Sequence, residues 1–355
     1  MDITSSTSLQ LPPDGIFNCT TITVAQGATL TFSNNSLNTP VYLLATGDVN
    51  INGTIDVSGQ NGVGNISGLG GPGGFAGGYS GSMMAGQSAG GDGLGPGGGK
   101  ANVTSGVYGS ALIFSGYQSI YNNTNTYGNS LLIPLVGGSG GGGSDGTSGP
   151  GSGGGGGAVL IASNTKITVN GAVNSYGGGA AVVTAPSGSG GAIRLLAPIV
   201  TGSGNIATHG GGWVPFGNYF TSLAYGRIRI DCTDNQAYLT LHLITPATRG
   251  SRMVVFPTNA PALDVIAVGG QPITQGTNSA VIIELAIGAS TNQTVLVQGR
   301  NFTNDVPISV VVTPQHGPSA SFDAVILQSS GNPPSANVPV IIPTGSVCQI
   351  HVWTR

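Results

Sequence analysis

Two carboxylates and two guanidinium groups lie close together in the sequence near residue 230. Glycoside hydrolysis uses two carboxylates held about 5 to 10 Å apart, so Asp231 and Asp234 are the best candidate pair for that chemistry, with His209 one predicted coil away. The same stretch also suits a turn that closes a coil, with Arg227 and Arg229 in surface or junction ion pairs. We favour this second interpretation and therefore predict no catalytic residue.

Other candidates for acid–base or metal chemistry are weaker. His209 is predicted to lie beside Tyr176 on an outward face, where an imidazole next to a phenol suits a general base, although incidental placement there is more common. Four histidines and three cysteines are scattered without the spacing of metal ligands, so we predict no metal site and no cofactor. Stacked Asp and Asn side chains offer oxygen ligands for Ca²⁺. A calcium site is nevertheless the less favoured alternative, because the Asp-rich nonapeptide pattern of calcium β-rolls is absent.

An aromatic cluster stands between two predicted coils. Amphipathic aromatic side chains on a surface loop stack on sugar rings or anchor a protein partner. The alternative is that they seal the end of the solenoid or pack one domain on the other. The cluster consists of Trp213, Phe216, Tyr219, Phe220 and Tyr225.

Three cysteines permit one disulfide and one free thiol. Cys232 opens the predicted C-terminal domain and Cys348 lies in its last strand, which makes them the candidate pair. Three reduced cysteines, with Cys19 as the third, are the alternative.

Three copies of one pattern organise the chain, at residues 41–62, 158–179 and 192–212. Each copy has an apolar strand, a turn and two short alternating segments, and it ends on glycines. A unit of this kind cannot bury its apolar face alone, whereas stacked copies can, so the repeat predicts a solenoid. Overlaying the copies places Ile55, Val173 and Ile206 in one inward stack. The 34- and 35-residue spacings from Gly157 to Gly191 to Gly226 favour a parallel β-helix.

A long glycine-rich insertion, about residues 60–157, separates the first two copies. Gly/Ser chains behave as flexible coil when they act as linkers. Alternatively, polyglycine packs as extended left-handed helices side by side, where only glycine fits, by the logic that governs collagen. Both alternatives stay open at this point.

The domain organisation follows from shifts in composition. Residues 1–15 are polar and predict an N-terminal arm that is available for strand addition to another copy. Residues 16–231 form the glycine-rich β-helix. Residues 232–355 contain short alternating strands at regular spacing, including 280–287, and predict an immunoglobulin-like β-sandwich. The fold class is therefore all-β.

Composition limits the classes of partner. The chain has 64 glycines among 355 residues, only 6% charged residues and a net charge of −3. A nucleic-acid-binding surface would require clustered Lys and Arg, which the sequence lacks, so we predict no nucleic-acid partner. No stretch of about 18 apolar residues is present, so we predict no membrane span.

The segments FNCTTITVAQGATLTF, NTPVYLLATGDVNINGTIDVSGQNG, GGPGGFAGG, GLGPGGGK and GGGGGAVLIA carry a family resemblance. Over residues 14–231, and more loosely in the tail, the chain resembles glycine-rich exported bacterial β-helix surface proteins of unestablished activity. The resemblance implies an extracellular or bacterial cell-surface location and supplies no catalytic residues. The chain departs from the group in lacking a visible signal peptide.

These observations together predict a non-enzymatic extracellular structural protein, a self-associating filament or adhesin-type subunit, with a cell-surface glycan as a candidate partner. Two alternatives remain. One is a phage receptor-binding or tail-tip protein, and the other is a polysaccharide lyase or glycoside hydrolase built on a β-helix.

Overall fold

The computed structural model of the chain describes residues 1–81, 88–101, 126–145, 151–179, 186–211, 215–216, 219–220, 224–234, 237–245, 247–277 and 279–355. It divides into two compact units, Met1–Val255 and Phe256–Arg355. Nearly all regular elements are β-strands, and two short 3-10 helices, η1 (Ala237–Thr240) and η2 (Gln328–Ser330), are also present. In the part of the chain that is described, no helix is long and apolar enough to cross a membrane.

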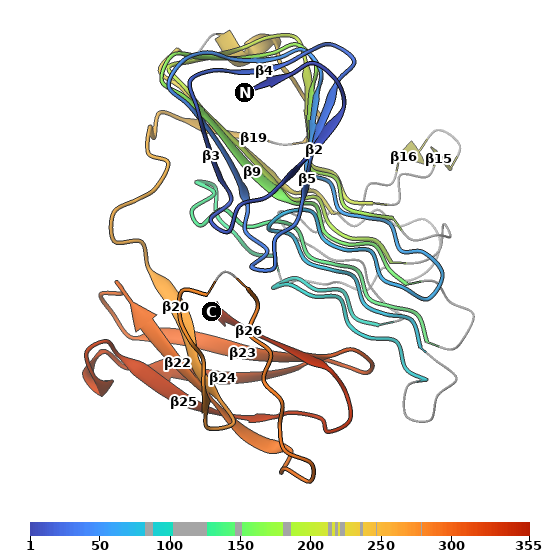
Figure 1. Cartoon of the computed structure of the whole chain (residues 1–355), viewed down its shortest axis with the longest axis vertical. Coiled ribbons are helices and arrows are strands. Elements are labelled where there is room, and N and C mark those ends of the chain that lie inside the picture. Colours follow the sequence, from blue (N-terminus) through green and yellow to red (C-terminus); the bar gives the residue numbers. More distant parts are fainter. Residues whose placement is uncertain are drawn as a thin grey trace. The chain divides into compact units, whose positions relative to one another are not determined.

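Three parallel sheets enclose the core of the first unit as a solenoid that is triangular in cross-section (Figure 1). Sheet A is ordered β1 (Asp2–Ile3), β4 (Ile22–Val24), β7 (Val49–Ile51), β10 (Lys166–Val169) and β13 (Ile199–Thr201). Sheet B is ordered β18 (His242–Leu243), β14 (Asn205–Ala207), β11 (Ala172–Asn174), β8 (Thr54–Asp56), β5 (Thr29–Ser33) and β2 (Thr7–Gln10). Sheet C is ordered β19 (Ala247–Gly250), β17 (Arg227–Asp231), β12 (Ala192–Leu196), β9 (Ala158–Ser163), β6 (Val41–Ala45) and β3 (Ile16–Cys19).

The predicted inward stack is confirmed. Val173 pairs in parallel with Ile55 on one side and with Ile206 on the other, and all three side chains are fully buried. Aligned apolar side chains of successive coils thus share one interior, which is why a unit this poor in helix-forming residues can build a core.

The N-terminal arm is a wrong prediction. Residues 2–3 and 7–10 form β1 and β2, which pair in parallel with β4 and β5 as part of the first coil. Ile3 and Leu11 are buried in the same hydrophobic cluster as the later coils. The short polar alternation of this segment suits an edge coil, because only every second side chain has to reach the core.

Extended glycine-rich segments lie side by side next to the solenoid, and we call them the glycine bundle (Figure 1). Its described residues are 57–81, 90–101, 136–145, 151–157, 175–179, 186–191 and 207–211. The segment 151–157 is fully buried and donates hydrogen bonds to three different neighbours in turn. Every third residue returns to the same neighbour: Gly154 and Gly157 donate to Gln60 and Val57, Ser152 and Gly155 to Gly78 and Phe75, and Gly153 and Gly156 to Pro186 and Ser189.

This threefold repeat is that of the polyproline II conformation, which has three residues per turn. Three further segments donate back to carbonyl groups of 151–157, through Gly68 and Gly71, through Gly138 and Gly141, and through Gly178. The described parts of residues 60–157 therefore follow the packed alternative and not the flexible linker. Side chains have no room here, because a Cβ on Gly153 would lie 1.8 Å from the carbonyl oxygen of Gly178.

The boundary between the units lies at residue 255, and the predicted boundary at 232 is wrong. Beyond Asp231 the chain adds β18 and β19, which pair with β14 and β17 of the solenoid. Apolar positions in these two strands are spaced too irregularly to be recognised as a further coil. The solenoid therefore needs these residues to cover its last complete coil.

The second unit contains two antiparallel sheets that share one hydrophobic cluster. The first is ordered β21 (Gln271–Pro272), β20 (Ala262–Val268), β22 (Asn292–Arg300) and β25 (Ser335–Ile341), and the second β24 (Ala320–Ile326), β23 (Val306–Pro314) and β26 (Cys348–Thr354). The strand predicted at 280–287 does not form. Ile283 and Leu285 still pack against the cluster. The segment therefore alternates half-buried and exposed side chains as a strand does, but it is not paired with any described strand.

Candidate functional site

Several connections of the glycine bundle begin and end at one end of it, which we call the distal end. Gly81 donates to the carbonyl oxygen of Ser144 at 2.8 Å, and Gly90 donates to Oδ1 of Asp145 at 2.6 Å. The described residues that flank the connections 82–87 and 146–150 are therefore neighbours.

The other connections reach the same end. The N–H of Gly151 bonds the carbonyl of Gly64 at 2.7 Å, and that of Gly62 bonds Gly179 at 2.9 Å, just before the connection 180–185. Gly211 bonds Gly188 at 2.9 Å, just before the connection 212–223. The distal end thus gathers the described residues that flank four connections, which are separated by long stretches of sequence.

The predicted aromatic cluster falls within the last of these connections. Its described part is a hairpin of β15 (Pro215–Phe216) and β16 (Tyr219–Phe220), in which Phe216 pairs with Tyr219 and Pro215 with Phe220. Trp213 lies outside the described residues, and so do the side chains of the hairpin. Tyr225 is half-buried. The use of these five residues for binding stays a prediction.

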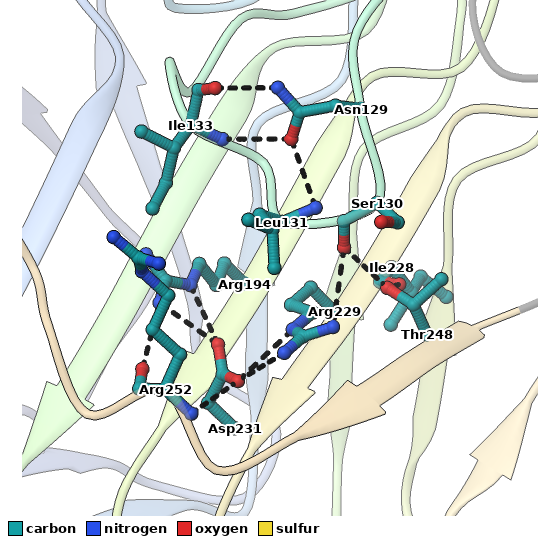
Figure 2. A network of polar contacts seen from close by, with 10 residues as sticks. All are labelled: Asn129, Ser130, Leu131, Ile133, Arg194, Ile228, Arg229, Asp231, Thr248 and Arg252. Atoms are coloured by element: carbon teal, nitrogen blue, oxygen red, sulfur yellow. Dashed lines mark hydrogen bonds and ion pairs between the residues drawn. The ribbon is translucent and has the colours of Figure 1, made fainter.

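Asp231 is the centre of a buried polar network on the outer face of sheet C (Figure 2). Its Oδ2 accepts hydrogen bonds from Nε of Arg194 at 3.0 Å and from Nη2 at 2.9 Å. Its Oδ1 accepts from Nε and Nη2 of Arg229 at 3.1 and 2.6 Å, and from the backbone N–H of Arg252 at 3.0 Å. The side chains of Arg194 and Asp231 are fully buried.

The arginines and a threonine of this face also hold a chain segment against the sheet. Arg227 donates to the carbonyl oxygen of Tyr127 at 3.0 Å. Figure 2 shows Thr248, which donates to the carbonyl oxygen of Ser130 at 2.7 Å. Leu132 and Leu135 of the same segment pack on apolar residues of β9 and β12. Sheet C is therefore covered on its outer face as well, which explains the continuous apolar runs in these strands.

The network leaves Asp231 unsuited to acid–base catalysis. Burial acts to raise the pKa of its carboxyl group, but hydrogen bonds from Arg229, Arg194 and the N–H of Arg252 outweigh burial and hold the pKa below its ordinary value of 3.8. Both oxygens are occupied by these donors. The carboxylate is thus a fixed counter-charge. The expected turn with surface or junction ion pairs is wrong, because Asp231 ends strand β17 and its ion pairs with Arg194 and Arg229 are buried.

The remaining members of the predicted cluster do not join it. Asp234 is exposed, so the two carboxylates do not share an environment, and Arg227 is turned toward Tyr127. Arg194 was missed. Its only signal was a charged residue inside the apolar strand AIRLLA, where a buried guanidinium requires a carboxylate partner. One carboxylate faces two guanidiniums, and Nη1 of Arg194 has no hydrogen-bond partner in the described structure.

Tyr176 and His209 lie side by side as expected from the overlay of the repeats. Their rings stack with centroids 4.0 Å apart and planes 22° apart. Burial, and then the charge of Asp56, raises the pKa of Tyr176. A phenol with a raised pKa stays protonated at neutral pH, so the pair is suited to stacking and hydrogen bonding and not to a phenolate base.

All three cysteines are free, so the expected disulfide between Cys232 and Cys348 is not formed. The thiol of Cys232 donates to the carbonyl oxygen of Asp234 at 3.2 Å within the first unit. That of Cys348 points to the carbonyl oxygen of Ser346 at 3.7 Å within the second. Burial raises the pKa of both thiols, which keeps them in the less reactive protonated form.

Within the described ranges, no group of three or more His, Cys, Asp or Glu residues gathers as metal ligands. No protein-family model matches the sequence. Comparison with curated proteins and with solved structures likewise finds no match.

Proposed function

We propose that this protein is a non-enzymatic, extracellular adhesin-type subunit of a bacterial cell surface. In this proposal the connections at the distal end of the glycine bundle contact the ligand, and the solenoid and the second unit serve attachment and self-association. The observation that supports it is that the described residues flanking four connections converge on one end of a bundle whose segments are hydrogen-bonded to one another.

The bundle suits a recognition scaffold for a physical reason. Binding residues are placed most often on loops held by a rigid support, and hydrogen bonds between the neighbouring backbone segments of the bundle oppose its deformation. Glycine segments allow close spacing of the supports, because no side chain keeps neighbouring backbones apart. The length and the sequence of the connections can then vary without altering the bundle.

We also infer that the second unit is an immunoglobulin-like β-sandwich. Two antiparallel sheets that share one apolar core support this inference. In the proposed function this unit mediates attachment, since sandwiches present edge strands that pair with other chains.

The test compares two changes from aromatic residues to alanine. The double variant W213A/F216A alters the connection 212–223, and F256A alters an aromatic side chain that is 50% exposed outside the bundle. Binding to a panel of cell-surface glycans and to whole bacterial or host cells is measured for both variants. We expect the double variant to lose at least about tenfold in affinity, equivalent to about 1.4 kcal/mol, and F256A to bind as the unaltered protein does.

Three outcomes would redirect the proposal. Undiminished binding by W213A/F216A would remove the aromatic connection from the ligand site. Binding confined to the host cells of a virus would favour the receptor-binding role at a virion tip. Turnover of a polysaccharide that is abolished by Asp231→Ala, in a variant that remains folded, would establish an enzyme instead.

A further inference from the structure

The strands at the N-terminal end of the solenoid have one free edge each. β1, β2 and β3 are the outermost strands of sheets A, B and C at that end, and each is paired on one side only. No other described segment is hydrogen-bonded to their free edges. Unpaired edge strands are templates for pairing with another chain.

The direction of the backbone groups follows from the hydrogen bonds to the next strand and from the two-residue period of a strand. Leu11 N–H bonds Ser33 in the next strand, so the N–H groups of Ser8 and Gln10 face the free side. The carbonyls of Gly15 and Cys19 accept bonds from the next strand, so the N–H of Asn18 also faces the free side.

The side chains of this end layer are apolar on the inside. Met1, Leu9, Phe17 and Cys19 pack on the core of the solenoid but are only half-buried. None of the inward side chains of β1 to β3 is charged. This end therefore combines free backbone donors with an incompletely covered apolar layer.

The opposite end is protected. There η1 packs against β13, the last strand of sheet A, and Tyr238 in η1 and Leu241 just after it are buried in the core. Arg249 is exposed, but it pairs in register with the buried Ile230 and so lies on the inner face of the terminal strand, where its guanidinium carbon is 4.8 Å from the centre of the Tyr238 ring. An inward charge on a terminal strand is one of the devices by which proteins prevent edge-to-edge association.

We propose that the N-terminal end of the solenoid is the interface of a two-fold dimer of this chain. The proposal specifies the self-association of the proposed function and rests on it. The three free edges lie along the three sides of one triangle, and only another solenoid end presents three edges in the same arrangement. Because Arg249 and η1 obstruct the other end, stacking head to tail is disfavoured, and the partner end is the same end of a second copy.

The geometry of such a pair is self-consistent. A two-fold axis perpendicular to the solenoid axis reverses the direction in which the partner's coil circulates. All facing strands are therefore antiparallel, with β2 opposite β2 of the second copy and β1 opposite β3. Antiparallel pairing of a strand with itself satisfies donors and acceptors on both sides and closes the assembly at two copies.

The test blocks the free edges without altering the inner ones. In the double variant S8P/N18P proline removes two outward N–H groups, a change that edge strands tolerate. The matched control S5P places proline at the exposed corner between β1 and β2. Mass is measured by sedimentation equilibrium over a range of concentrations, and folding by circular dichroism.

We expect the unaltered chain and S5P to reach twice the 35.0 kDa monomer mass. S8P/N18P should remain folded with a dimer dissociation constant raised at least about tenfold. If S8P/N18P does not fold, S8C replaces it. A disulfide-linked dimer that forms on oxidation of S8C, and that the unaltered chain with its three native thiols does not form, supports the interface.

A monomeric unaltered chain, equal dimerisation of S8P/N18P, or open-ended filaments would overturn the proposal. The ligand assay is separate from this measurement. A monomer that still binds the ligand through the connection 212–223 would contradict the dimer and support the proposed recognition. A dimer that does not bind the ligand would support the dimer and contradict the proposed recognition.

Discussion

Asp231 connects three parts of the first unit. Its carboxylate joins β12 through Arg194, β17 through Arg229, and the chain after β19 through the backbone of Arg252. A buried ion pair is weak evidence for net stabilisation, but removing one partner leaves an uncompensated charge in the interior. Here the loss of Asp231 would leave two buried guanidiniums without a counter-charge.

Asp231→Asn should therefore lower the free energy of unfolding of the first unit by about 3–5 kcal/mol, measured by urea denaturation at pH 7. The control Asp234→Asn alters an exposed carboxylate and should change the value by less than about 0.5 kcal/mol. Equal effects of the two changes would contradict the structural role of the network.

The pH dependence of this effect has a definite sign. Because the folded-state pKa of Asp231 is below its ordinary value of 3.8, its stabilisation is fully present above that value and is lost as the pH falls through the folded-state pKa. The difference in unfolding free energy between the unaltered protein and Asp231→Asn should accordingly shrink below pH 4. A difference that stays constant down to pH 2 would contradict the lowered pKa.

At the scale of elements, the glycine bundle depends on the absence of side chains at specific positions. A Cβ on Gly153 would lie 1.8 Å from a backbone oxygen, and that oxygen cannot move without displacing a neighbouring segment. On Gly210, at the margin of the bundle, the nearest atom would be 3.1 Å away. The two positions differ in packing while both are glycines of the same bundle.

Gly153→Ala should destabilise the first unit by about 3 kcal/mol or more, at the upper end of the range for overpacking. Gly210→Ala should cost less than about 1 kcal/mol, because its neighbour has to shift by only a few tenths of an ångström. Thermal unfolding of both variants measures the difference. Comparable losses at the two sites would indicate that the bundle is not closely packed.

The elements were predictable where the sequence repeats. Ile55, Val173 and Ile206 recur at the same place in each copy, and the periodicity alone fixes their stack. Leu69 and Phe75 belong to segments whose neighbours are set by hydrogen bonds among glycines, and glycine runs carry no periodicity that identifies a partner. The buried ion pair of Arg194 was not predicted for a different reason. Its partner Asp231 is 37 residues away in the sequence and lies on the adjacent strand.

For the molecule as a whole, the main question is which residues complete the C-terminal end of the solenoid. Ile228 and Ile230 in β17 are buried in the core, and β19 lies beside them. Composition changes near residue 232, where the glycines end, but the solenoid continues to residue 255. The change in composition therefore marks the end of the glycine-rich sequence and not the end of the folded unit at Val255.

Two fragments test this boundary. The fragment 1–255 retains β18, β19, η1 and the Arg252 bonds to the network, so we expect it to unfold cooperatively at nearly the temperature of its unit in the full chain. The fragment 1–231 uncovers Ile228 and Ile230. Burying an isoleucine contributes about 1.5–3 kcal/mol, and each kcal/mol shifts the Tm of a unit this size by about 2–4 °C. Its Tm in differential scanning calorimetry should therefore fall by roughly 10 °C. Equal melting of the two fragments would mean that the last coil is complete without β19.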